Sequence, residues 1–205
     1  MTAPVRLAWT PAPVRVGRRE AAWALLRDMV GAPVRIENTC PRCGGGHGAV
    51  RVHAAAGTPR TRASIAYAGG YAIVALAPAS AASSIGVDAE SAESARDLAA
   101  VLGRPGATAR DWVRVEAALK ADGRGLRVDP ARVEVAAVSG GACAGSGGSR
   151  VRSSEVAPSA TPEWTAVVPD RDDPLHGWDV TGPAGVLVSV ALAGAAERSL
   201  RTVWS

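Results

Sequence analysis

The chain has 205 residues, of which 47% are hydrophobic, and a formal net charge of +4. This size and composition predict a globular protein with a substantial buried core. The positive charges are scattered and no apolar run approaches 18 residues, which argues against nucleic-acid binding, a membrane span or a secretion signal. Three cysteines do not suggest a disulfide framework, so we expect a reduced, cytoplasmic setting.

Helix and strand patterns alternate in the first part of the chain. Apolar residues recur at helical spacing over 19–30 and the pattern stops at Gly31, which predicts an amphipathic helix. Gly69-Gly70 lies between two apolar runs within 63–78, as expected for a β-hairpin. The other elements expected in this part are a turn-rich connection at 39–49, strands at 49–54 and 84–90, and a second helix at 93–103.

The second part of the chain begins with the clearest helix. Thr108 is a suitable N-cap, Asp111 lies in the first turn, and Gly123 ends the pattern. Three strands are expected after it, at 131–140, 164–168 and 185–194. The Gly/Ser-rich stretch 139–162 has little apolar content and is predicted to be a flexible loop.

A possible internal duplication sets the expected fold class. The run "GVLVSVALAG" near the end resembles "GGYAIVALAP" in the first part, each being an apolar strand after a Gly turn. We therefore predict an α+β fold of two similar halves, 1–106 and 107–205. Each half of this pseudo-dimer would be a small antiparallel sheet with a packed helix.

Two acidic residues lie at the end of an apolar strand. Asp88 and Glu90 are two positions apart, so strand alternation directs both carboxylates to the same side. Hard oxygen ligands of this kind suit Mg²⁺, which usually takes one or two carboxylates together with waters and phosphates. The alternative is an ordinary solvated strand end.

Lys120 is the one lysine beside 22 arginines. Where composition favours arginine, a retained lysine suggests a need for a compact point charge, although chance retention explains it equally simply. Lys120 lies four residues after Glu116, with Trp112 one turn earlier, so all three share a helix face. On the helix alone this is a surface ion pair. If the helix packs beside the Asp88 strand, the same residues form a site for a metal–phosphate complex.

Cys40, Cys43, His47 and His53 have the residue types of a zinc site. Their spacing, C-x₂-C-x₃-H-x₅-H, matches no common zinc finger, and the glycines between them alternatively shape a turn. Either cysteine as a nucleophile is disfavoured because no activating partner is evident. The sequence leaves zinc binding open.

Three segments taken in order, "SIAYAGGYAIVALAP", "GVDAE" and "WVRVEAALKADGRGLRVDP", resemble 4'-phosphopantetheinyl transferases of the surfactin-synthetase-activating type, in their actinobacterial form. The resemblance covers about residues 64–130 and includes the family's G-[IV]-D-x-E motif. It implies a monomeric, Mg²⁺-dependent enzyme. Such an enzyme transfers phosphopantetheine from coenzyme A to a serine of an acyl or peptidyl carrier protein and releases adenosine 3',5'-bisphosphate.

The resemblance also implies roles for individual residues. Asp88, Glu90 and Glu116 would bind Mg²⁺ on the pyrophosphate, Glu116 would act as general base, and Lys120 would contact phosphate and take part in catalysis. The expected coenzyme A contacts are those made by Tyr67, Ala68, Lys120, Arg51, His47 and Arg19.

Several positions depart from the family pattern. The family's phosphate-binding S-H-S is Ala66-Tyr67-Ala68, and the lysine expected before the helix glutamate is Val115. Arg18, Arg19, Arg51 or His47 would then have to supply the lost charge. These departures motivate one alternative from another class, a non-catalytic module that binds coenzyme A or a carrier protein. A small zinc-dependent interaction protein is a further alternative.

Overall fold

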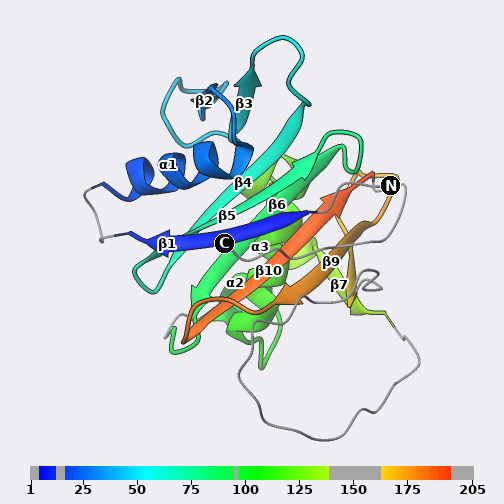
Figure 1. Cartoon of the computed structure of the whole chain (residues 1–205). Coiled ribbons are helices and arrows are strands. Elements are labelled where there is room, and N and C mark those ends of the chain that lie inside the picture. Colours follow the sequence, from blue (N-terminus) through cyan, green and yellow to red (C-terminus); the bar gives the residue numbers. More distant parts are fainter. Residues whose placement is uncertain (1–4, 13–16, 95–96, 139–162, 195–205) are drawn as a thin grey trace, which may run out of the picture.

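The computed structural model describes residues 5–12, 17–94, 97–138 and 163–194. They form an α+β fold of antiparallel sheets with few helices (Figure 1). In chain order the elements are β1 (Arg6–Pro11), α1 (Arg18–Val30), β2 (Val34–Glu37), β3 (Arg51–Ala54), β4 (Thr61–Ala68), β5 (Tyr71–Pro78), β6 (Ser84–Ser91), α2 (Leu98–Leu102), α3 (Ala109–Asp122), η1 (Gly125–Arg127), η2 (Pro130–Arg132), β7 (Glu134–Ala137), β8 (Trp164–Val167), β9 (Leu175–Val180) and β10 (Val186–Ala193).

The first sheet has the strand order β1-β5-β4. Strands β4 and β5 form a hairpin whose turn is Gly69-Gly70, with φ values of 56° and 80° that favour glycine. Helix α1 packs on this sheet, where Leu26 contacts a core that includes Val74 and Leu76. The short sheet β2-β3 lies beyond α1 (Figure 1).

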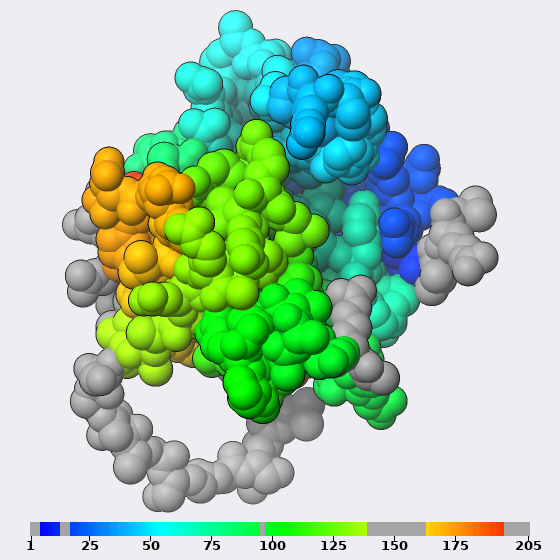
Figure 2. All heavy atoms as spheres, turned by 180° about the vertical axis from the view of Figure 1, so that it is seen from behind, coloured from blue at the N-terminus to red at the C-terminus, as the bar shows by residue number. Residues whose placement is uncertain are grey.

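The larger sheet has the order β6-β10-β9-β8-β7 and is covered by α3. The helix buries Val115 and Leu119 against Trp164, Leu175 and Ala191, all fully buried. From behind, α3 and the turns that follow it form the green surface over this sheet (Figure 2).

A second core joins the two sheets. Ile73 of β5 packs with Val87 of β6 and Val190 of β10, all three completely buried. Strand β4 also lies along β6, and the Val87 backbone N–H donates to the Ser64 hydroxyl at 3.0 Å. Because Ser64 is buried, this bond fixes β4 beside the acidic end of β6.

Most elements expected from the sequence are confirmed. The helix predicted at 19–30 is α1, the 63–78 hairpin is β4-β5, and the helix after Thr108 is α3. The predicted strands at 49–54, 84–90, 164–168 and 185–194 correspond to β3, β6, β8 and β10.

Other local expectations need correction. Within the described part of 93–103, the predicted helix forms at 98–102, where the Asp97 side chain accepts from Ala100 N–H and Gly103 ends the helix. The strand predicted over 131–140 begins only at Glu134, because Pro130 starts a 3₁₀ turn capped by Asp129. Strands β1, β2 and β9 were not predicted.

The predicted loop at 139–162 lies outside the described residues. The division into halves at residue 106 stays a prediction. Strand β6 precedes this residue but pairs with β10, which belongs to the predicted second half. Within the described part of the chain, none of the helices combines the length and the apolar character needed to cross a bilayer.

Candidate functional site

A pocket of about 260 Å³ opens where β4, β6, α1 and α3 meet. Its charged lining comes from three elements that are far apart in sequence: Arg18 from α1, Asp88 and Glu90 from β6, and Glu116 and Lys120 from α3. The rest of the lining consists of Ile65, Ala66, Tyr67, Ala89 and Trp112. The structure therefore brings together Asp88, Glu90, Glu116 and Lys120, the residues for which the resemblance implied Mg²⁺ binding or catalysis.

Strand β6 presents its two acids to the pocket by simple alternation. Asp88 is buried and Glu90 is half-buried, while Ala89 between them packs into the core shared by the two sheets. Ser189 of β10 lies directly opposite Asp88 in the antiparallel register. The burial of Asp88 and the partial burial of Glu90 restrict the positions that these carboxylates adopt.

Gly86 allows α3 to lie directly against β6. A Cβ at this position would collide with the carbonyl oxygen of Ala117 and lie 2.5 Å from the backbone nitrogen of Ala121. The Ser84 hydroxyl, on the same strand, donates to the Ala121 carbonyl oxygen. The missing side chain thus brings the helix backbone, and with it Glu116 and Lys120, to the edge of the acidic strand.

Both ends of α3 are fixed by local hydrogen bonds. Thr108 and Asp111 form a capping box, in which Asp111 N–H donates to the Thr108 hydroxyl at 3.3 Å and Thr108 N–H donates to the Asp111 carboxylate at 2.8 Å. At the other end Gly123 has φ 85° and its N–H donates to Leu119 O. A well-capped helix holds the spacing of its functional side chains.

The Lys120 ammonium binds the strand across the pocket. It donates to Asp88 Oδ1 at 2.6 Å and to the Val87 carbonyl oxygen at 3.0 Å. The Asp88 side chain is only 11% exposed, so water screens this pair less than a surface pair. The sequence alone suggested an ion pair between Lys120 and Glu116, whereas the tertiary contact here is with Asp88.

The donor set of the pocket fits a hard divalent cation. Carboxylates at Asp88, Glu90 and Glu116 are the oxygen ligands that Mg²⁺ prefers. In the described residues, however, their ligand atoms do not all lie within 4.8 Å of one another. Octahedral Mg²⁺ places its ligand oxygens about 2.9 to 4.2 Å apart, so no more than two of these carboxylates could contact one such ion directly in this arrangement.

Tyr67 lies beneath the guanidinium of Arg18, which is 4.9 Å from the ring centroid. Burial raises the pKa of the Tyr67 hydroxyl, and the neighbouring Arg18 and Arg19 only partly oppose that shift. Tyr67 is therefore a neutral, aromatic part of the wall at ordinary pH. Arg18 supplies the positive charge on this side of the pocket.

The other predicted coenzyme A contacts do not line this pocket. Ala68 packs against the core between the sheets, and Arg51 is exposed on β3. His47 contacts Cys43, and Arg19 donates to the carbonyl oxygen of Gly46 at 2.7 Å. Of the cationic substitutes suggested for the lost histidine, the structure places only Arg18 in the pocket, within the described residues.

A polar network beside the pocket was missed by the sequence analysis. Arg114 of α3 donates from Nη2 to Asp179 Oδ2 at 2.6 Å, and the buried Ser189 donates to Asp179 Oδ1 at 2.6 Å. Burial alone would raise the pKa of Asp179, but these hydrogen bonds outweigh it and hold the pKa below its ordinary value. In the strand register Ser189 of β10 lies opposite Asp88 of β6 on one side and opposite Asp179 of β9 on the other. The network therefore links α3 to β9 and to β10, the strand next to β6.

Neither a scan of protein-family models nor a search of curated proteins finds a match to this chain. The geometry of the pocket and the sequence motifs are therefore the grounds for assigning a function.

Proposed function

We propose that the protein is an Mg²⁺-dependent 4'-phosphopantetheinyl transferase that acts on an acyl or peptidyl carrier protein. The observation that carries the proposal is the meeting of Asp88, Glu90, Glu116 and Lys120 in one pocket. These residues lie in "GVDAE" and "WVRVEAALKADGRGLRVDP", two of the three segments on which the sequence resemblance rests. A module that only binds its partner has no evident need for three carboxylates and an ammonium around one phosphate.

The proposed reaction is a phosphoryl-type transfer. The serine hydroxyl oxygen of the carrier bonds to the phosphorus that bears pantetheine in coenzyme A. The bond from that phosphorus to the bridging pyrophosphate oxygen breaks, and adenosine 3',5'-bisphosphate leaves with the bond electrons. The serine proton passes to the Glu116 carboxylate, which lines the pocket and lies on a helix held against β6.

The acids and the lysine have distinct proposed roles. Asp88 and Glu90 would hold Mg²⁺, which when bound neutralises pyrophosphate charge. Lys120 would exchange part of its contact with Asp88 for a phosphate oxygen, where an ammonium stabilises developing negative charge. This accounts for a compact lysine where the chain otherwise uses arginine.

Arg18 takes the proposed place of the family's phosphate-binding histidine. It lies on the pocket wall directly over Tyr67, which occupies the histidine position in the motif. A guanidinium binds phosphate through paired hydrogen bonds and stays charged at all relevant pH values.

We also propose that the fold is a pseudo-dimer. The order strand, helix, two strands and hairpin occurs twice, as β1-α1-β2-β3-β4-β5 and as β6-α3-β7-β8-β9-β10, with α2 added in the second copy. The sheet orders β1-β5-β4 and β6-β10-β9 correspond in the same way. This correspondence supports a proposed division between β5 and β6, whereas the sequence analysis put it at residue 106.

The test is incubation of the full chain with coenzyme A, Mg²⁺ and a panel of apo-carriers from fatty-acid, polyketide and nonribosomal peptide synthases. Intact mass spectrometry should show one added phosphopantetheine group on at least one carrier, and excess chelator should prevent the addition. If all carriers stay in the apo form while the protein remains folded, the transferase proposal fails.

A further inference from the structure

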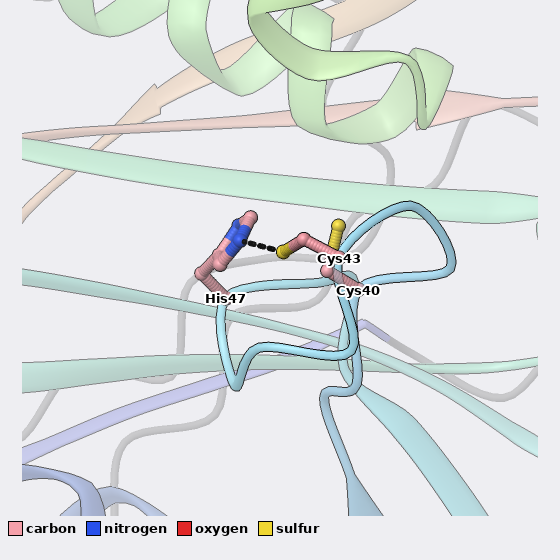
Figure 3. Close-up of side chains that lie close together, drawn as sticks. All are labelled: Cys40, Cys43 and His47. Carbon is pink, nitrogen blue, oxygen red and sulfur yellow. Dashed lines mark hydrogen bonds between the residues drawn. The ribbon is translucent and has the colours of Figure 1, made fainter.

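A cluster of two cysteines and one histidine lies outside the pocket. Cys40, Cys43 and His47 come from the loop between β2 and β3, and their three potential ligand atoms all lie within 4.8 Å of one another (Figure 3). The Cys43 sulfur is 3.0 Å from His47 Nε2. We propose that these three residues form a zinc site, with its fourth position open to water.

The distances suit tetrahedral zinc after a small adjustment. Zn–S bonds of about 2.3 Å and Zn–N bonds of about 2.0 Å place neighbouring ligands about 3.5 to 3.8 Å apart. The Cys43–His47 contact has only to open by about half an ångström to admit the ion. Two thiolates and a neutral imidazole balance the charge of Zn²⁺, and thiolates do not suit Mg²⁺.

The backbone of the loop is arranged around the first thiol. The backbone N–H groups of Arg42 and Cys43 donate toward the Cys40 sulfur. A metal-binding cysteine has to be a thiolate, which these donors favour. The Gly44 N–H also donates to the Cys40 carbonyl oxygen at 2.9 Å, which closes the turn between the cysteines.

Gly45 leaves the space that the ligands occupy. A Cβ at this position would lie 3.1 Å from the His47 ring and 3.3 Å from the Cys43 sulfur, closer than side chains normally approach. The absence of a side chain therefore allows the imidazole to turn toward the sulfur atoms. Gly44 has a different role, because its φ of 72° is a backbone conformation that favours glycine and no atom lies near the position of a Cβ.

His53, the fourth residue of the sequence pattern, does not join the group. Its Nε2 lies 2.8 Å from the Glu37 carboxylate, an interaction between β2 and β3. The site therefore has three protein ligands, and His53 offers a matched control.

The metal would fix a loop that contacts α1. Arg19 of α1 and Asn38 both donate to the Gly46 carbonyl oxygen, each at 2.7 Å. Gly46 lies between Cys43 and His47, so ordering the ligands orders this contact. We infer a structural role for the ion, independent of transfer chemistry in the pocket.

The test uses the reduced, metal-free full chain loaded with one equivalent of Co²⁺. The site predicts a thiolate-to-cobalt charge-transfer band, tetrahedral visible bands, and displacement of cobalt by one equivalent of Zn²⁺. Zinc should also raise the melting temperature. Excess Mg²⁺ should leave the spectrum unchanged. Because these readouts do not depend on carrier modification, they succeed or fail separately from the transferase proposal.

Variants assign the ligands. The double variant Cys40→Ser/Cys43→Ser should lose the bands and the stabilisation by zinc, and His47→Ala should weaken cobalt binding at least tenfold. His53→Ala and Cys143→Ser, which replaces the third cysteine, should bind like wild type. The inference is overturned if wild type gives no thiolate–cobalt band, if the double variant keeps it, or if Cys143→Ser abolishes it.

Discussion

The close contact between α3 and β6 at Gly86 makes a quantitative prediction. In Gly86→Ala the new Cβ meets helix backbone rather than flexible side chains, and the Ala121 nitrogen would lie 2.5 Å away. Relief of this overlap requires α3 to move by about 1 Å, and overpacking of this kind costs about 1–3 kcal/mol of unfolding free energy. For a chain of this size we expect the melting temperature to fall by about 2–12 °C.

The same displacement should affect the pocket. A shift of about 1 Å in Glu116 and Lys120 predicts a loss on the order of 10²-fold in the rate of carrier modification. The control is Gly123→Ala at the C-cap of α3, where φ is 85° and no atom is near the new Cβ. This control should lose about 1 kcal/mol through backbone strain but keep its rate.

Thermal unfolding and initial rates of holo-carrier formation, measured on both variants, separate the two effects. A Gly86→Ala protein with wild-type melting temperature would refute the argument that this glycine permits the close packing. A Gly86→Ala protein with the wild-type rate, whatever its melting temperature, would refute the link between the position of α3 and the activity of the pocket.

Three further predictions concern single side chains. Lys120→Arg should fold normally but lose on the order of 10²-fold in turnover, because a wider guanidinium is misplaced at the phosphate; a change within about twofold would remove Lys120 from the site. Arg18→Ala should raise the KM for coenzyme A about tenfold or more, whereas Arg27→Ala, on the last turn of the same helix, should leave it unchanged in steady-state assays. Because the pKa of Asp179 is lower in the folded state than in the unfolded chain, its contribution to stability is present above the unfolded-state pKa and is lost as the pH falls through the folded-state pKa. Unfolding by urea at a series of pH values should show Asp179→Asn less stable than wild type near neutral pH, with the difference narrowing below about pH 4; a constant difference would contradict the pairing with Arg114.

Local patterns in the sequence predicted the parts of the site that lie within single elements. Strand alternation correctly directed Asp88 and Glu90 to one side, and helical spacing correctly put Glu116 and Lys120 on one face. Gly69-Gly70, Thr108 and Gly123 marked the hairpin and the helix ends because each satisfies a local backbone requirement.

Contacts between elements were not predictable in the same way. The partner of Lys120 is Asp88, 32 residues away, and it depends on how closely Gly86 lets the helix approach. The packing of α1 directs the Arg18 side chain into the pocket, whereas the side chain of the neighbouring Arg19 donates to the Gly46 carbonyl oxygen. The sequence showed no reason to prefer one of these adjacent arginines over the other.

Elements that depend on their neighbours were missed or shortened. Strand β1 has a weak pattern of its own and is defined by pairing with β5, where Leu7 and Ala8 become buried. Helix α2 begins after its N-cap Asp97 and ends at Gly103, so it is shorter than the predicted helix. Tertiary pairing therefore determined these boundaries more than local propensity.

The central claim is that the pocket carboxylates catalyse transfer, and the most direct measurement is the initial rate of holo-carrier formation by Glu116→Gln. We compare it with wild type and with Glu93→Gln, which changes an exposed glutamate in the turn after β6. At saturating Mg²⁺ and coenzyme A, Glu93→Gln should match wild type and Glu116→Gln should be slower by about 10²-fold or more, as expected for loss of a general base. A Glu116→Gln rate equal to that of wild type would contradict the account.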